Sequence, residues 1–482
     1  MHPIDPVRNR AVGARFSRAV ARLCVALSVA VGVLACSMGD VASPARPAPD
    51  EVTTFRQVQP ILAAHCQSCH RDGQIAPFPL VTYEDARLRA AAIASVTRSG
   101  EMPPWTARTS PDCTPPAPWR NDERLSEADI AALAAWSEGG AVEGDLDDVA
   151  PTIAPSNDGL GRVDRDLGSS EPFAAAGAED QFICFLLDPK LDEERFARGL
   201  RVVPGNRKVV HHVTVSIANA EEVAKIVESG RRAGSVEPTT GGPGFPCGDA
   251  TLGRNLQVWT PGGTRVDLPD GVGIRLEKGS LIVLGVHYSN AHDGALPDAT
   301  RVQIQFADER PRFEMIAGSI GGAGRVQDGL VSPNGNADYT FLVPANASHH
   351  VEQMRFVTQT KAAVYGVMAH MHLSGVDMKI DVSRKAPDGS SVDICLLQDK
   401  WNFHWQRTYV FGAPIDALPT FEPGDVITLT CTYDNSVHNP QLLHYLAERG
   451  EGPLEGIRDR RLGPRVEQEM CNFYPQFIVP LK

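Results

Sequence analysis

Two histidines, His370 and His372, stand two positions apart in the apolar stretch GVMAHMHLSG. On a β-strand, the side-chain period of two places both rings on one face, where they can converge on a single metal ion. Met371 then points to the opposite face, and we expect it in the core. The same spacing also fits two ordinary polar residues on a sheet, so a metal site needs a third ligand. The candidate third ligands are Met368, His404, His438 and Met470.

A second group of histidines lies earlier in the chain. His211 and His212 are adjacent in KVVHHVTVSI, and neighbours on a regular strand point to opposite faces. Both can reach one metal only if the strand twists or bulges, or if one ring uses Nδ1 and the other Nε2. His287 ends the apolar run SLIVLGVHY, where an unpaired imidazole is costly. Three imidazoles suit copper or zinc.

The segment Cys66-Gln67-Ser68-Cys69-His70 has the CxxCH pattern of covalent haem attachment. The two thiols can each bond a haem vinyl group, and His70 can bind the iron. A zinc site or a redox dithiol is the alternative. Met102, in GEMPPW, is the expected sixth iron ligand, although it also fits a packing role. A His/Met pair leaves no open iron position, which is typical of an electron carrier.

The first 36 residues have the pattern of an export signal. Several arginines precede the apolar run LCVALSVAVGVLA, and the VLAC sequence ending at Cys36 resembles a bacterial lipobox. We expect lipidation at Cys36, on the periplasmic side of the cell envelope or at the outer membrane. A plain secretory signal cut near Ala35 is the alternative. Both place the mature chain outside the cytoplasm, where disulfides persist.

The composition bounds the remaining possibilities. A length of 482 residues predicts about three domains. The net charge of −13, without a basic stripe, argues against a nucleic-acid partner. The 43 glycines and 37 prolines predict many turns and therefore a large β content.

The elements expected along the chain change character once. A tether at 37–50 leads into a helical region at 51–145, in which Ser126 is predicted to cap a helix through Asp129. An acidic, proline-containing linker follows at 146–168. Beyond it, strand-like runs separated by turn signals predict antiparallel β-sandwiches, which we divide into 169–309 and 310–482. The expected fold is therefore a small all-α domain followed by two all-β sandwiches.

Four stretches resemble one family in order: LPDGVGIRLEKGSLIVLGVHYSN, VMAHMHLSG, EPGDVITLTCTYDNS and VEQEMCNFYPQ. They resemble the copper type II, ascorbate-dependent monooxygenases, which include peptidylglycine α-hydroxylating monooxygenase and dopamine β-hydroxylase. The resemblance covers about residues 170–482. The preceding helical region looks like a c-type cytochrome, which the animal enzymes lack.

The resemblance implies two copper ions on two jelly-roll-like sandwiches. One copper, the electron-storing ion, is assigned to His211, His212 and His287. The other, where dioxygen and substrate react, is assigned to His370, His372 and Met470. The resemblance also implies disulfides Cys184–Cys247 and Cys431–Cys471. Cys113 and Cys395 are left either free or paired with each other.

The chain departs from the peptide-acting family member at one position. That member has an arginine two residues before the HxH pair, where it holds a substrate carboxylate; here the residue is Met368. Asn472 and Tyr474 do match the family's substrate pocket. The departure argues against a peptide C-terminus and favours an apolar or neutral substrate.

The sequence thus predicts a copper-dependent monooxygenase that hydroxylates a C–H bond of a small organic substrate with dioxygen. Electrons are expected through a covalently attached haem c, with ascorbate or another periplasmic electron donor as the external source. The alternative is a non-enzymatic haem–copper electron-transfer or copper-binding protein of the cell envelope.

Overall fold

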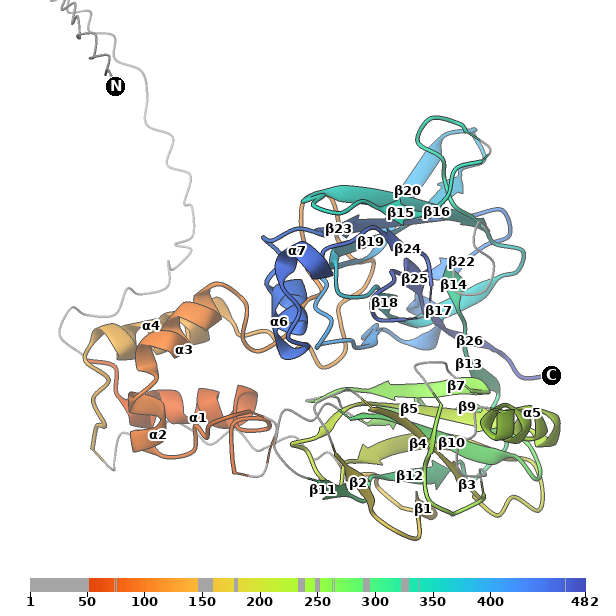
Figure 1. Ribbon diagram of the computed structural model, residues 1–482, viewed down its shortest axis with the longest axis horizontal. Helices are drawn as coiled ribbons and strands as arrows, with labels where there is room; N and C mark the ends of the chain where they lie inside the picture. Colours follow the sequence, from red (N-terminus) through yellow and green to blue (C-terminus); the bar gives the residue numbers. More distant parts are fainter. Residues whose placement is uncertain are drawn as a thin grey trace, which may run out of the picture. The chain divides into compact units, whose positions relative to one another are not determined.

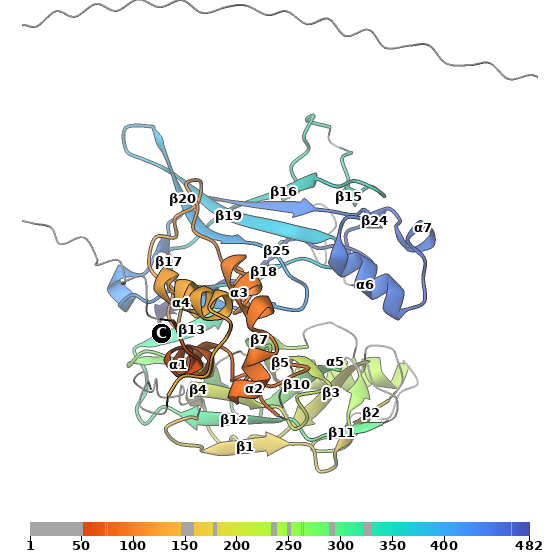
Figure 2. The ribbon, with the colours of Figure 1, turned by 90° about the vertical axis from the view of Figure 1, so that its left-hand side faces the viewer.

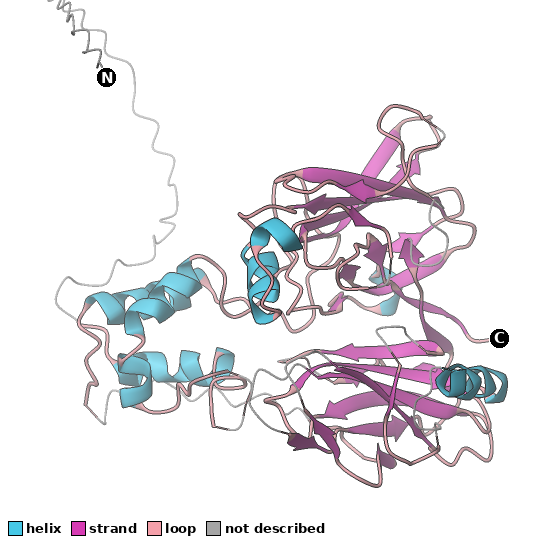
Figure 3. Cartoon of the chain, in the orientation of Figure 1, coloured by secondary structure: helices cyan, strands magenta, loops and turns pink. Residues whose placement is uncertain are grey.

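The computed structural model describes residues 52–482, apart from 73, 75, 146–158, 177–180, 233–238, 248–251, 262, 264, 289–294, 322–328, 337 and 464. The predicted export signal with Cys36 and the tether at 37–50 lie outside the described residues, as does 146–158 of the predicted linker. Strands dominate the described part, and the helices are short (Figure 3).

Four helices follow one another near the start of the described chain: α1 (Phe55–His65), α2 (Tyr83–Arg87), α3 (Ala90–Arg98) and α4 (Glu127–Glu138). The Ser126 side chain accepts a hydrogen bond from the amide of Asp129, which confirms the predicted cap. The four helices share a small apolar core that includes Phe55, Leu62 and Trp136. Figure 2 shows α3 and α4 side by side.

The prediction of a separate, all-α cytochrome c-like domain is wrong. The chain from α3 to α4 contains no helix, and it buries Trp105 and Trp119 in the main β-sandwich core. A disulfide joins Cys113 in this segment to Cys395 of the second sandwich. Residues Val52–Lys482 accordingly form one compact unit. The helical periodicity was visible in the sequence, but the sandwich contacts of the intervening loop were not.

The first β-sandwich supports the predicted β architecture (Figure 1). Its inner sheet has the order β6-β3-β10-β5-β7. These strands are β3 (Gln181–Leu187), β5 (Val210–Ala218), β6 (Phe245–Pro246), β7 (Arg254–Trp259) and β10 (Leu281–Tyr288). The facing strands are β1 (Arg165–Gly168), β4 (Arg195–Val203), β8 (Val266–Asp267), β9 (Val272–Leu276) and β12 (Arg301–Phe306). Alternating apolar residues of both sheets fill the space between them.

The second sandwich is built in the same way. Its outer sheet has the order β16-β23-β19-β20. These strands are β16 (His350–Val357), β19 (Gly375–Lys385), β20 (Ser391–Asp399) and β23 (Val426–Tyr433). The opposite strands are β13 (Phe313–Ala317), β17 (Ala362–Val367), β21 (Tyr409–Val410), β22 (Thr420–Phe421) and β26 (Gln476–Pro480). A small sheet, β14 (Ile320–Gly321), β25 (Asn472–Phe473) and β18 (Ala369–His370), carries the first histidine of the HxH motif.

The two sandwiches share one continuous sheet. β13 pairs in parallel with β9 of the first sandwich and antiparallel with β26 of the second. The predicted border between residues 309 and 310 falls in the connection just before β13, and it stays a prediction.

The remaining elements lie at the edges of the sandwiches. They are β2 (Phe173–Ala175), α5 (Ala220–Arg232), β11 (Leu296–Asp298), β15 (Leu342–Val343), η1 (Ile415–Ala417), α6 (Pro440–Glu448), α7 (Pro453–Gly456) and β24 (Arg460–Arg461). Within the described part of the chain, none of the helices combines the length and the apolarity that crossing a lipid bilayer requires.

Three disulfides join described cysteines. Cys184–Cys247 and Cys431–Cys471 are the predicted pairs, and both are confirmed. Cys113 pairs with Cys395, which settles the choice that the sequence left open. Cys66 and Cys69 of the CxxCH motif stay reduced. Disulfides of this number indicate an oxidising, extracytoplasmic compartment.

Candidate metal centres

A β-bulge brings His211 and His212 to the same side of their sheet. His212 in β5 lies opposite His287 in β10, whereas Val210 lies opposite Tyr288, so His211 is the extra residue between the two pairs. A bulge of this kind re-aims the side chain of the inserted residue. The distortion that two adjacent histidines need in order to share a metal is therefore present at this position.

The three rings of this group, which we call the triad, converge through a specific set of nitrogens. His211 Nδ1 lies 3.2 Å from His287 Nδ1, which in turn lies 2.7 Å from His212 Nε2. One donor atom from each residue lies within 4.8 Å of the other two. A metal bound at about 2.0 Å to each nitrogen would set them about 3 Å apart. The triad therefore fits a metal ion, with Nδ1, Nε2 and Nδ1 as donors.

Burial keeps the His212 imidazole of the triad neutral. Phe182 stacks on the His287 ring with centroids 4.2 Å apart. Burial, followed by the nearby His287 and His211, lowers the pKa of His212 well below its ordinary value. His370 adds to this lowering, so the two histidine sets lie within range of each other's charge. Neutral imidazoles are the form that binds metals.

The HxH motif is positioned by pairing with the strand that follows Met470. In the β18–β25 ladder, His370 lies opposite Asn472. The His370 and His372 rings lie with their centroids 5.2 Å apart. The Asn472 amide nitrogen lies 3.4 Å from the Met470 sulfur, which places the thioether beside the residue that pairs with His370. We call His370, His372 and Met470 the thioether set.

Hydrogen bonds fix both rings of the thioether set. His370 Nδ1 lies 2.9 Å from Gln406 Oε1, and His372 Nδ1 lies 3.1 Å from the Gln468 carbonyl. Because both acceptors are oxygens, each Nδ1 carries the hydrogen and each Nε2 keeps its lone pair for a metal. Burial lowers the pKa of His370 to about 3 and that of His372 to about 4.

Several contacts restrain Met470. The Tyr433 hydroxyl donates to the Met470 carbonyl at 2.8 Å, and the next residue, Cys471, is disulfide-bonded. Met470 is buried, with 6% of the residue exposed. Met371, in contrast, is fully buried in the sandwich core, as expected from the alternation.

The predicted substrate residues lie beside the thioether set. Asn472 is fully buried, and its amide nitrogen lies 3.3 Å from the Tyr474 hydroxyl. The Tyr474 amide donates to the Met368 carbonyl at 2.9 Å, and the Tyr474 ring lies 5.7 Å from that of His370. The Met368 sulfur accepts from Thr408 Oγ1 at 3.8 Å.

The CxxCH motif begins where α1 ends. The His70 amide donates to the Cys66 carbonyl at 2.8 Å, so the motif forms a single turn. The His70 Nδ1 donates to the Phe78 carbonyl at 3.2 Å, which leaves Nε2 for an axial bond. Burial raises the pKa of Cys66 to about 12, so both cysteines are protonated thiols. Reduced cysteines and an oriented imidazole fit covalent haem attachment.

Among the described residues, no hydrogen bond joins Met102 to His70. The Met102 amide donates to the carbonyl of Val96, in the last turn of α3, at 3.1 Å. Its role as a sixth ligand stays a prediction.

The Cys69 thiol lies within electrostatic range of both sandwiches. After burial, which raises its pKa, the charges that act on it include Glu123, Arg207 and Arg407. Arg207 precedes the triad by four residues, and Arg407 directly follows Gln406. The CxxCH motif thus lies within range of charges in the segments that carry both histidine sets.

His404, which the sequence offered only as a candidate third ligand for the HxH pair, contacts the other histidine group. His404 reaches the triad from the second sandwich, with its Nδ1 3.0 Å from His211 Nε2. The short motif WNFHWQ gives no periodic signal for such a contact, because the two residues are 193 positions apart.

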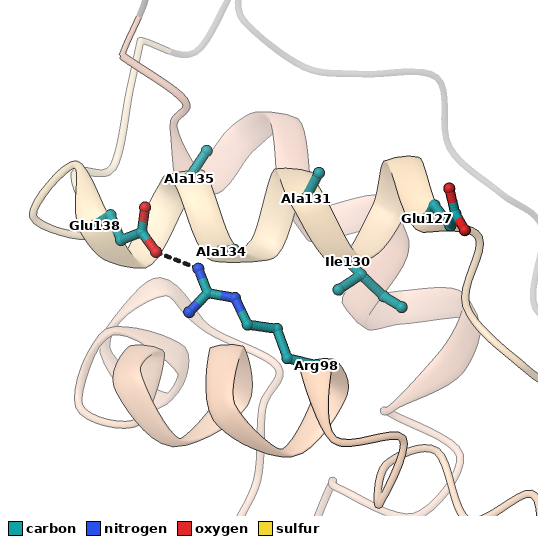
Figure 4. A pocket seen from close by; sticks show the side chains of 7 residues that line it. All are labelled: Arg98, Glu127, Ile130, Ala131, Ala134, Ala135 and Glu138. Atoms are coloured by element: carbon teal, nitrogen blue, oxygen red, sulfur yellow. Dashed lines mark hydrogen bonds and ion pairs between the residues drawn. The ribbon is translucent and has the colours of Figure 1, made fainter.

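A surface depression between α3 and α4 lies apart from these groups (Figure 4). An ion pair between Arg98 and Glu138 crosses it. The other lining residues are Glu127, Ile130, Ala131, Ala134 and Ala135. None of them is a predicted site residue.

Comparisons with known proteins leave the family open. No family model matches the chain. The major capsid protein P2 from bacteriophage PM2 is 7% identical, covers 66% of this chain and 98% of its own, and has a TM-score of 0.27. The PBSX exported protein XepA is 7% identical over 60% of this chain and 92% of its own, with a TM-score of 0.13. Likenesses this weak assign neither a fold family nor a function.

Proposed function

We propose that the chain is a copper-dependent monooxygenase that hydroxylates a C–H bond of a small, neutral organic substrate with dioxygen. The observation that carries this proposal is the pairing of two unlike donor sets within electrostatic range of each other. The triad offers three imidazoles, and the thioether set offers two imidazoles with a sulfur. This is the division of ligands that the resemblance to the copper type II monooxygenases implies.

The donor atoms decide which metal suits each set. A thioether beside two imidazoles is a soft ligand set that favours Cu(I) over zinc. Bound there, copper supplies the reduced centre that reacts with dioxygen, while copper in the triad stores the second electron. His370, His372 and Met470 would hold the reactive ion, and the hydrogen bonds to Gln406 and Gln468 leave both Nε2 atoms available to it.

The residues around the thioether set suit a neutral substrate. Asn472 and Tyr474 present amide and hydroxyl groups, and Met368 supplies an apolar surface. The Asn472 Oδ1 atom is buried and has no hydrogen-bond partner among the described residues, so a substrate N–H or O–H can donate to it.

The electron supply is proposed to be a haem bonded to Cys66 and Cys69, with His70 as an iron ligand. The proximity of Cys69 to Arg207 and Arg407 supports an internal transfer, one electron at a time. Ascorbate or another periplasmic donor would then reduce the haem. We further propose that lipid at Cys36 holds the protein at the cell envelope.

Oxygen insertion tests the proposed function directly. Copper-reconstituted, fully reduced protein is mixed with a panel of small neutral organic compounds under ¹⁸O₂, and products are analysed by mass spectrometry. A product that gains one labelled oxygen atom is expected, together with two coppers per chain. Two coppers without labelled product would instead favour an electron carrier, and fewer than two would contradict the site assignment.

A further inference from the structure

His404 meets the nitrogen of His211 that the triad does not use. The triad converges through His211 Nδ1, and His404 Nδ1 lies 3.0 Å from Nε2 on the other side of that ring. The two rings are steeply inclined, with an interplanar angle of 69°. His404 therefore faces the back of a candidate ligand and not the point where the three donors converge.

The direction of this hydrogen bond follows from metal binding. A neutral imidazole that binds a metal through Nδ1 carries its hydrogen on Nε2. His211 Nε2–H then donates to His404 Nδ1, which is the acceptor. Ligand histidines commonly donate their second nitrogen in this way, and the bond fixes the ring's tautomer and orientation.

His404 belongs to a segment, residues 401–407, that also contacts the thioether set. Trp401 Nε1 donates to the His372 carbonyl at 2.9 Å, and Gln406 Oε1 accepts from His370. The segment is itself anchored, because the Phe403 amide donates to Gln441 Oε1 at 2.7 Å. One short stretch of the second sandwich thus touches ligands of both sets.

We infer that His404 is a positioning residue for the triad, supplied by the second sandwich to a metal set carried by the first. The inference rests on the proposed function only in that the triad binds copper. Through the segment 401–407, the orientation of His211 is tied to that of His370 and His372. Copper binding to the triad therefore depends on a residue outside the sandwich that carries all three of its ligands.

The test is copper binding by the full chain in a His370→Ala/His372→Ala background, where the triad is the intact copper set. His404→Phe keeps an aromatic ring but removes the acceptor, and we expect Cu(II) affinity to fall about 10- to 100-fold. His404→Asn should stay within about threefold of the background, because its Oδ1 occupies the position of Nδ1 and also accepts. His349→Phe, at an exposed histidine of the same sandwich, is the control.

Pulsed electron paramagnetic resonance supplies a readout that altered packing would not reproduce. The remote nitrogen of a copper-bound imidazole reports its own hydrogen bond, so one of three imidazole signals should change in His404→Phe and be restored in His404→Asn.

Unchanged affinity and unchanged spectra in His404→Phe would overturn the inference, as would four copper-bound imidazoles in the background. A background that binds no copper would overturn both the inference and the proposed triad. Normal copper binding without oxygen insertion by the wild type would remove only the proposed function.

Discussion

The carboxylate of Glu469 accepts a hydrogen bond from the main-chain amide of His372 at 2.9 Å. The same buried carboxylate accepts from the amide and the hydroxyl of Ser374 at 2.7 and 2.6 Å, and from the Met470 amide at 3.3 Å. One side chain, with no exposed surface, thus binds the main chain of two candidate ligands from distant parts of the sequence. The thioether set depends on this carboxylate for its shape.

Replacing Glu469 with alanine should therefore disturb both the fold and the thioether set. Several buried N–H and O–H groups would lose their acceptor, at a cost of about 2–5 kcal/mol in the free energy of unfolding. Copper should fall from two ions to one per chain, because Glu469 bonds the main chain of His372 and Met470 in the thioether set. Chemical denaturation and metal analysis check both effects. Glu143→Gln, at the exposed ion pair with Arg56, is the control and should change stability by less than about 0.5 kcal/mol.

Met470→Leu tests the thioether without emptying its space. The side chains are similar in volume, so we expect stability to change by less than about 1.5 kcal/mol. The Cu(I) affinity of the thioether set should fall more than about 100-fold, since losing a ligand costs more than losing a ligand's hydrogen-bond partner. Competition with a Cu(I) chelator measures it. Met371→Leu, at the buried methionine on the opposite face, should leave both coppers in place. Equal Cu(I) affinities in the two variants would exclude Met470 as a ligand.

Cys66→Ser/Cys69→Ser separates the haem from the copper sites. The variant should lose covalently bound haem, measured by its absorbance in alkaline pyridine, while copper content stays at two per chain. Hydroxylation should then require ascorbate at a concentration that the wild type does not need. His65→Ala, next to the motif but outside it, should retain the haem. Covalent haem in the double serine variant would refute attachment at these thiols.

The sequence predicted those features that depend on local alternation or on motif order. A period of two predicted that the His370 and His372 rings lie close together, and their centroids are 5.2 Å apart. The need for a bulge at His211 follows from its adjacency to His212. Other features depend on contacts between residues far apart in the chain. The helical pattern could not show that Trp105 and Trp119 pack into the sandwich core, so the small domain was predicted as independent. The contact of His404 with His211 is equally invisible in either motif.

Asp399 makes the stability of the protein depend on pH. It lies at the end of β20, is 3% exposed, and its Oδ1 has no hydrogen-bond partner among the described residues. Burial raises the pKa of Asp399 from 3.8 to about 6, against smaller lowering contributions from Thr106, Arg108 and Arg407. Between these two values the folded state binds more protons than the unfolded state, so stability falls as pH rises through this range. Above about pH 7 the loss is complete, and burial of the ionised carboxylate lowers the free energy of unfolding by about 3 kcal/mol.

Asp399→Asn should remove this penalty, because the amide keeps the shape and stays neutral at every pH. We expect the variant to be about 2–3 kcal/mol more stable than the wild type at pH 7.5 and nearly equal to it at pH 4. Urea unfolding at several pH values measures the difference. Asp308→Asn, at an exposed ion pair with Arg162, should shift stability by less than about 0.5 kcal/mol at either pH. A stability difference that is the same at pH 4 and pH 7.5 would mean that Asp399 is already ionised in the folded protein at the lower pH.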